Sequence, residues 1–159
     1  MRETVKAFLN YLTSERGLSG NTIAAYGNDL YQMVDILEEG GLLPSGSHRW
    51  ESVDKPLLTQ YALDLQERGY SATTRARKLA SVKSLFSFLV EEGILSQDPT
   101  ESLTSPRIGR VLPKFLSEED MELLLQETAR GDTPEAQRDA AMIELMYATG
   151  MRVSELVSL

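Results

Sequence analysis

Residues 71–90 read SATTRARKLASVKSLFSFLV. The large apolar side chains of this segment recur every three or four residues, at Leu79, Val82, Phe86 and Leu89. That interval places them on one face of an α-helix, which is the pattern of a helix packed against a core. Ser71 precedes the pattern as a candidate N-cap, and Gly93 follows it as a candidate C-cap. The segment therefore predicts an amphipathic helix with defined ends.

The same interval recurs N-terminal to this helix, in residues 5–12, 23–37 and 58–65. We find no segment of convincing length in which apolar and polar residues alternate, as a half-buried strand requires. Candidate helix starts are Ser19, Asp54 with Pro56, Ser71, Ser117 with Asp120, and Thr133 before Pro134. Left-handed caps are expected at Gly17, Gly40, Gly69, Gly93, Gly131 and Gly150. The sequence predicts an all-α protein.

Four helices are expected over residues 2–93, followed by a linker and two or three further helices. Pro99, Pro106 and Pro113 interrupt residues 96–115 and prevent a continuous helix there. We place a domain boundary near residue 105, which gives domains 1–105 and 106–159. The second domain is too short to bury a core of its own, and residues 153–159 read as a helix without an end signal. We expect the chain to stop inside that second domain.

Composition sets limits on the function. The chain has 159 residues, of which 42% are hydrophobic and 25% charged, as in globular proteins. It has no cysteine and one histidine, His48, which excludes disulfides, thiolate metal sites and multi-histidine metal centres within the chain. There is no signal peptide pattern and no apolar run long enough to span a membrane. We expect a cytoplasmic protein with no metal, no cofactor and no membrane partner.

The net charge of −8 argues against general binding to polyanions, but the charges are unevenly distributed. No acid occurs between Arg68 and Val90, where there are five bases, or between Ser102 and Ser117, where there are three. The chain therefore contains two locally basic segments although its net charge is negative. These segments are compatible with binding to nucleic acid.

The segment around Arg152 is a further candidate site. An apolar helix is expected to end at Thr149-Gly150, and Arg152 stands at the start of the next helix. A guanidinium beside unpaired helix N–H groups is well arranged to bind a phosphate. The alternative is a surface arginine beside a capping motif, and the residues alone leave both interpretations open.

Residues 148–156, ATGMRVSEL, resemble the first arginine box of the tyrosine recombinases, the phage integrase family, and are most similar to its bacterial Xer branch. Residues 19–30 resemble the second helix of the family's core-binding domain, and residues 71–79 resemble its fourth. The segment 98–117 is similar to the family's interdomain segment, and Arg138-Asp139 lies where the family has that pair. The resemblance extends over almost the whole chain.

The resemblance implies a SAM-like four-helix core-binding bundle, followed by a linker and the first helices of a truncated catalytic domain. It implies duplex DNA as the partner and, in the full-length protein, a homo- or heterotetramer of recombinase subunits on paired sites. The family cuts and rejoins DNA through a 3′-phosphotyrosyl intermediate, and the Xer branch suggests chromosome dimer resolution near the bacterial nucleoid. Arg152 matches the arginine that contacts the scissile phosphate.

The family's other catalytic residues, including its tyrosine nucleophile and a His-x-x-Arg box, follow that arginine by more than a hundred residues. His48 does not match the box, because no arginine follows it by three residues. The 159-residue chain alone is therefore expected to be inactive, although the full-length family member is an enzyme.

DNA contacts are expected from the helix at 72–92, which at about 1.5 Å per residue is some 30 Å long. The candidates are Arg75, Arg77, Lys78 and Lys83, with Asn21 and Thr22 at the start of the second helix as further donors. One departure from the Xer pattern is Gly27-Asn28, where basic residues are common. The alternatives are a solvated helix without DNA contacts, a phage or transposon integrase, a naturally short DNA-binding module, and a helical protein–protein module.

Overall fold

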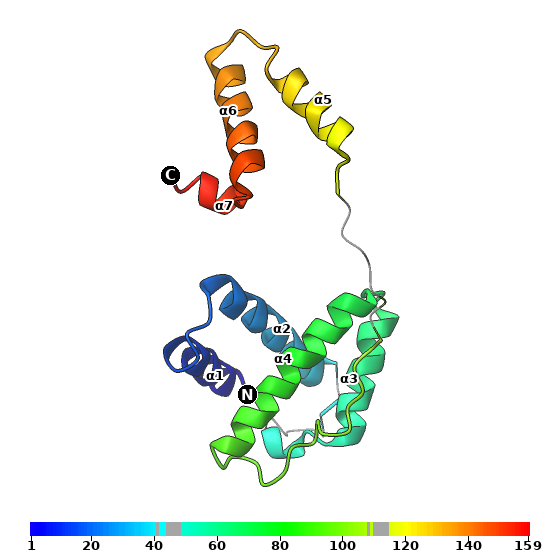
Figure 1. Cartoon of the computed structure of the whole chain (residues 1–159). Helices are drawn as coiled ribbons and strands as arrows, with labels where there is room; N and C mark the ends of the chain where they lie inside the picture. Colours follow the sequence, from blue (N-terminus) through cyan, green and yellow to red (C-terminus); the bar gives the residue numbers. More distant parts are fainter. Residues whose placement is uncertain (41, 44–48, 108, 110–114) are drawn as a thin grey trace. The chain divides into compact units, whose positions relative to one another are not determined.

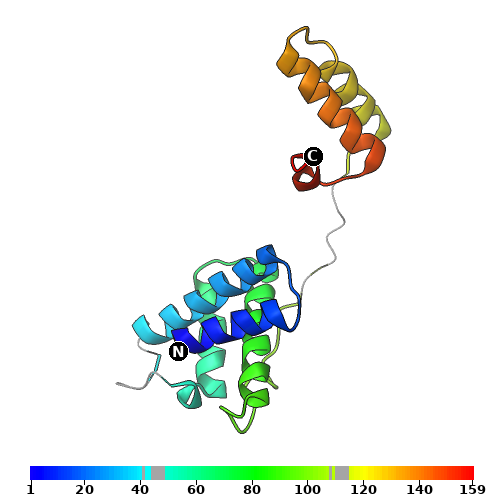
Figure 2. The same ribbon diagram turned by 90° about the vertical axis from the view of Figure 1, so that its left-hand side faces the viewer.

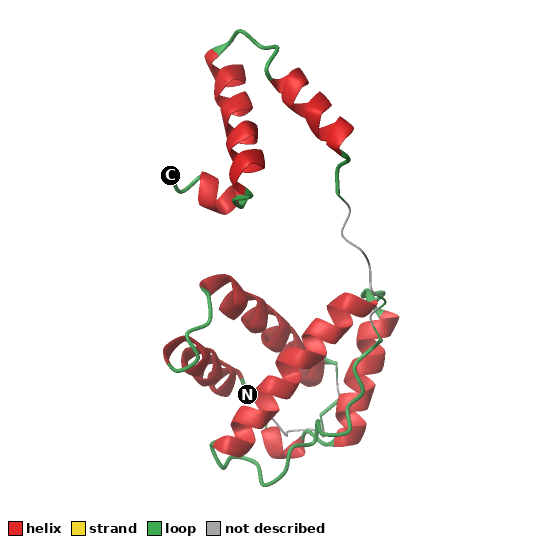
Figure 3. Cartoon of the chain, viewed as in Figure 1, coloured by secondary structure: helices red, strands yellow, loops and turns green. Residues whose placement is uncertain are grey.

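A computed structural model describes residues 1–40, 42–43, 49–107, 109 and 115–159. The regular secondary structure of this described part is all helical, and it contains no strand (Figures 1 and 3). The elements are α1 (Arg2–Ser14), α2 (Gly20–Glu39), the 3₁₀ turn η1 (Trp50–Ser52), α3 (Lys55–Glu67), α4 (Ala72–Glu91), α5 (Glu118–Thr128), α6 (Pro134–Thr149) and α7 (Val153–Leu156). The all-α prediction is confirmed. His48, Arg110, Pro113 and Lys114, which the sequence analysis counted, lie outside the described residues.

The helix starts follow the capping residues that the sequence indicates. The Ser19 hydroxyl accepts a hydrogen bond from the Thr22 N–H at 3.3 Å, and the Ser71 hydroxyl accepts one from Thr74 at 3.2 Å. Asp54 caps α3, Thr133 caps α6, and Ser117 with Asp120 forms a reciprocal capping box on α5. Each cap satisfies a backbone donor that would otherwise lack a partner.

The predicted glycine caps are confirmed at four positions and wrong at two. Gly17, Gly69, Gly93 and Gly150 have positive φ, between 60° and 78°. Gly40 ends α2 in a right-handed conformation with φ −72°, and Gly131 also lies outside the left-handed region. The N–H of Gly40 still bonds to the Ile36 carbonyl at 3.0 Å, so the last turn of α2 closes without a reversal of the backbone.

The chain divides into two compact units, Met1–Gly109 and Arg110–Leu159. In the first unit α1 and α2 lie side by side, and α4 packs against α1, α2 and α3 (Figures 1 and 2). The largest fully buried side chains come from all four helices: Phe8, Leu30, Met33, Leu37, Leu58, Tyr61, Leu65, Leu79, Leu85, Phe86 and Leu89. Trp50 closes one side of this core with its ring edge-on to Phe86, 5.7 Å between centroids. The four helices thus share one continuous core.

The second unit has a different character. Of its described residues only Leu156 is buried, and α5 and α6 contain no buried residue. Several of its large apolar side chains are exposed: Phe115, Leu116, Leu123, Leu124, Leu145, Tyr147, Val153, Val157 and Leu159. These helices are therefore held by their own hydrogen bonds and caps and by little apolar burial.

Candidate nucleic-acid interface

The outer face of α4 is lined by small side chains. Thr73, Ala80 and Ser87 are exposed there at intervals of seven residues, while the apolar face of the same helix is buried. Arg77 and Lys83 stand at the two edges of this face, since six residues turn the helix by about 120° net. The result is a low ridge with a cation on each side. We call it the α4 ridge.

On the α2 side of the ridge, a groove brings together three of the predicted DNA contacts. It is lined by Asn21, Thr22, Ala25, Tyr26, Arg77, Ala80 and Ser81. Asn21 and Thr22 lie in the first turn of α2, so the guanidinium of Arg77 shares the groove with the N-terminal, electropositive end of a 20-residue helix. This is the α2–α4 groove. It offers a charged donor and neutral donors from two elements.

Arg77 is held in this groove by a buried acid. One of its terminal N–H groups donates to Oδ2 of Asp29, whose side chain is 1% exposed. The Arg77 side chain itself is 51% exposed, so its charge reaches the surface although one donor is used. A guanidinium has five N–H donors, and the others are available to a second acceptor.

Lys78, which the sequence analysis named as a DNA contact, is buried. Its ammonium donates to Oδ1 of Asp29 at 3.0 Å and to Oε1 of Gln32 at 2.5 Å, and its side chain is 7% exposed. The ammonium also lies 5.2 Å from the centre of the Tyr70 ring. An ammonium has three donors, and this one is enclosed by its partners. The geometry gives no support to a direct DNA contact by Lys78.

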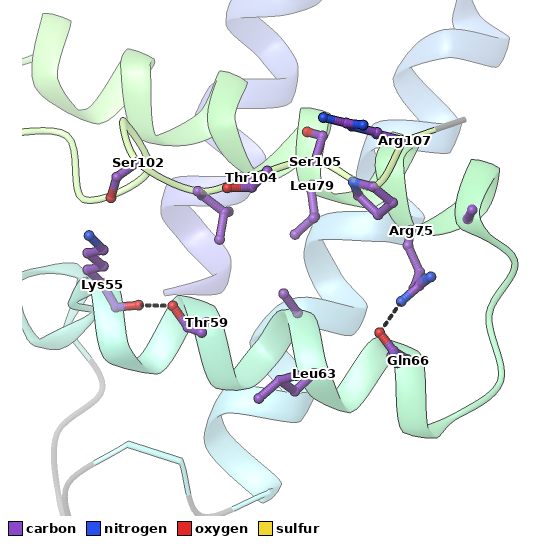
Figure 4. A pocket seen from close by; sticks show the side chains of 14 residues that line it. Lys55, Thr59, Leu63, Gln66, Arg75, Leu79, Ser102, Thr104, Ser105 and Arg107 are labelled. Atoms are coloured by element: carbon purple, nitrogen blue, oxygen red, sulfur yellow. Dashed lines mark hydrogen bonds between the residues drawn. The ribbon is translucent and has the colours of Figure 1, made fainter. Parts of the chain in front are cut away.

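On the other side of the ridge, α3, α4 and residues 102–107 enclose a second groove, the α3–α4 groove (Figure 4). Its walls are formed largely by small and aliphatic side chains, and its cations are Lys55, Arg75 and Arg107. Nη1 of Arg75 donates to Oε1 of Gln66 at 2.6 Å, whereas the buried Nε of Arg75 has no hydrogen-bond partner in the described structure. Among the described residues that line this groove there is no carboxylate. It is therefore a locally positive depression in an acidic protein.

Two of these cations were not among the predicted DNA contacts. Lys55 starts α3, and Arg107 lies in the segment that follows α4, so neither belongs to the helix on which the sequence analysis concentrated. Residues 102–107 fold back between α3 and α4, and the hydrophobic pattern of the sequence gives no sign of this.

Arg68, which the basic segment included, is paired with Asp64 at 2.5 Å, and this hydrogen bond raises the pKa of the guanidinium. Lys83 lines neither groove.

Arg152 belongs to the second unit. α6 ends at Thr149, and the Gly150 that follows has φ 68° and donates its N–H to the Met146 carbonyl at 2.8 Å. Two residues later Arg152 caps the short helix α7. The carboxylate of Glu155 accepts from its backbone N–H at 2.7 Å and from Nη1 at 3.3 Å. The Arg152 side chain is 82% exposed, so most of its donors face solvent.

The chain belongs to the phage integrase family. The phage integrase N-terminal SAM-like domain matches residues 5–93, and the phage integrase family matches residues 114–159. A tyrosine recombinase XerC of Roseiflexus castenholzii is 46% identical over all 159 residues. XerD proteins of Vibrio vulnificus and Listeria monocytogenes serotype 4b are 40% and 37% identical over 155 and 159 residues. The predicted family resemblance is confirmed.

The chain spans about half the length of the curated relatives it matches: 49%, 48% and 52% of these three proteins, while 98% or more of this chain is covered. Among the described residues, no three acidic or histidine side chains are grouped so that they could hold a metal ion. None of the described helices is both long and apolar enough to cross a membrane.

Proposed function

We propose that the first unit binds duplex DNA with the α4 ridge in the major groove. The observation that carries this proposal is the pair of cation-lined grooves on the two flanks of a ridge of small side chains. A major groove about 12 Å wide admits a helix whose outer face is not bulky. Arg77, Asn21 and Thr22 would then meet phosphates on one flank, and Lys55, Arg75 and Arg107 on the other.

We further propose that the whole protein, of which this chain corresponds to about half, is a site-specific recombinase. The relatives named tyrosine recombinase XerC and XerD support this role. Arg152 would stabilise the negative charge that develops on the scissile phosphate, because its forked donors are exposed at the start of α7. Chromosome dimer resolution by a tetramer on paired sites is the specific activity that we propose, and a phage or transposon integrase is the alternative within the family.

DNA binding is tested by titrating the chain with a fluorescent duplex at several salt concentrations. Arg77→Ala and Arg75→Ala should each weaken binding about tenfold, which corresponds to about 1.4 kcal/mol. Each should also reduce the slope of log K against log salt by about 0.9, since one phosphate contact is lost. Lys6→Ala on α1 changes the net charge equally and lies in neither groove, so it should leave both quantities nearly unchanged.

The same titration, combined with the reading frame of the gene, separates the other classes of function. A helical protein–protein module would show no affinity for duplex DNA even at low salt. A short DNA-binding module would bind DNA, but its gene would stop after the codon for Leu159.

If the reading frame instead continues to a His-x-x-Arg box and a tyrosine nucleophile, Arg152→Ala in that longer product should slow strand cleavage about 10²–10³-fold. Its DNA affinity should change little.

A further inference from the structure

Asp29 is an acid buried at the base of the proposed DNA surface. Its carboxylate is 1% exposed and receives hydrogen bonds from three side chains of α4. Lys78 donates to Oδ1 at 3.0 Å, Ser81 donates to Oδ2 at 3.1 Å, and Arg77 also donates to Oδ2. The carboxylate thus links α2 to three positions over one turn of α4.

These three donors differ in what they present to the outside. Lys78 and Ser81 are buried, so their contacts with Asp29 hold the two helices together. Arg77 alone extends from the buried carboxylate to the surface, where it lines the α2–α4 groove with Asn21 and Thr22. A long flexible side chain fixed at one donor loses much of its rotamer freedom before any ligand arrives. Its remaining donors then need less ordering when they bind a phosphate.

We propose that Asp29 is a positioning residue for DNA binding, which holds the Arg77 guanidinium in place beside Asn21 and Thr22. This inference rests on the proposed function. It also predicts that removal of Asp29 changes the DNA affinity in the opposite direction from the one that net charge alone would give. Removal of an acid makes the protein less negative, which by itself favours binding to a polyanion. If Asp29 positions Arg77, its removal weakens DNA binding instead.

The test compares Asp29→Asn with Asp35→Asn. Asp35 lies on the same helix, is 41% exposed and pairs with Arg2, and its replacement changes the net charge by the same amount. Asp29→Asn should weaken duplex affinity about fivefold and lower the salt slope towards that of Arg77→Ala, whereas Asp35→Asn should leave affinity equal or slightly higher. Equal or tighter binding by Asp29→Asn would overturn the proposal.

A double-mutant cycle distinguishes positioning of Arg77 by Asp29 from an effect of Asp29 on the fold. In the Arg77→Ala background, Asp29→Asn should weaken binding no further, because the group that it positions is absent. An additional loss of the same size would show that Asp29 acts through the fold and not through Arg77. If no variant and not even the parent chain binds DNA, the proposed function fails; if only Arg77→Ala has an effect, the positioning role fails alone.

Asp29→Asn leaves the Lys78 ammonium buried without its carboxylate, and removal of one member of a buried ion pair is strongly destabilising. The double variant Asp29→Asn with Lys78→Met keeps the net charge at −8 and replaces the buried cation by an apolar side chain. It should melt closer to the parent protein than Asp29→Asn does and should still bind DNA about fivefold more weakly. Restored affinity together with restored stability would contradict the positioning role.

Discussion

Burial decides which cations of α4 can act at the surface. Arg77 and Lys78 are adjacent in sequence and share the acceptor Asp29, yet their side chains are 51% and 7% exposed. Their Cα positions differ by about 100° around the helix, which directs one side chain to the rim and the other inward. A buried ammonium with two oxygen partners contributes to the packing of α2 on α4, and Arg77 supplies the accessible charge.

The sequence contained part of the information needed to separate these two residues. Lys78 continues the apolar stripe of its helix, which indicates a position facing the core. Its partner Asp29 lies between Tyr26, Leu30 and Met33 on the apolar stripe of α2, which is the signal for a buried acid that must be paired. What the sequence could not show is that these two stripes face each other. That pairing spans 49 residues and depends on the tertiary packing.

A residue-scale prediction concerns Tyr61, whose buried hydroxyl has no hydrogen-bond partner in the described structure. Burial, with a smaller contribution from the nearby Asp29 charge, raises the pKa of Tyr61 above its usual value near 10. The folded state therefore retains the proton longer than the unfolded state. The resulting stability is fully present below about pH 10 and is lost as the pH rises through the folded-state pKa.

Tyr61→Phe should remove this part of the alkaline destabilisation. It should be neutral at pH 7 or stabilise by up to about 1 kcal/mol, because it deletes an unpaired buried hydroxyl. Urea unfolding between pH 8 and pH 12 measures both effects, with the exposed Tyr147→Phe as the matched control. A strong loss of stability at pH 7 would show that the Tyr61 hydroxyl has a partner.

At the scale of the elements, the helix starts could be predicted and the helix ends only partly. N-caps depend on a side chain and a backbone N–H three residues apart, as in Ser71 and Thr74, so the signal is local. The conformation after a helix depends on where the next segment must go, and Gly40 ends α2 without a positive φ. A glycine permits a left-handed residue but does not impose one.

An element-scale prediction contrasts two glycines of the first unit. Gly27 lies inside α2, and an added Cβ would meet Leu9 Cδ1 at 3.4 Å and Tyr31 at 3.9 Å, which are ordinary contacts. Gly27→Ala should stabilise the protein by about 0.5–1 kcal/mol, since alanine favours the helix. Gly69 has φ 78° and open space around the Cβ position, so Gly69→Ala should destabilise by about 1 kcal/mol through the backbone alone. Thermal melts of the two variants should shift in opposite directions.

At the scale of the whole molecule, the grooves are the part that the sequence could not predict. The helices, the family and the cations of α4 follow from local patterns and motifs. The α3–α4 groove joins Lys55, Arg75 and Arg107, which come from three segments and are related only by the fold. Charge counts along the sequence identified two basic segments, but they could not show which cations are paired, as Arg68 is with Asp64, and which face a groove.

The contrast between the two units leads to a prediction for the stability of the whole chain. α6 has 16 residues and no buried side chain, whereas α1 has 13 residues and buries Val5, Phe8 and Leu12. Isolated helices of this length are marginal in water, so slow amide exchange in α6 would need packing against other elements. The described structure provides little such packing. Native-state hydrogen exchange should therefore show the amides of α5 and α6 exchanging at least about tenfold faster than those of α1, although α6 is the longer helix.

The measurement should be made at several protein concentrations, because association of copies would protect the exposed leucines in a concentration-dependent way. Protection of α6 equal to that of α1 in a dilute monomer would contradict the prediction, since it would require that Leu123, Leu145 and their apolar neighbours be covered within the chain.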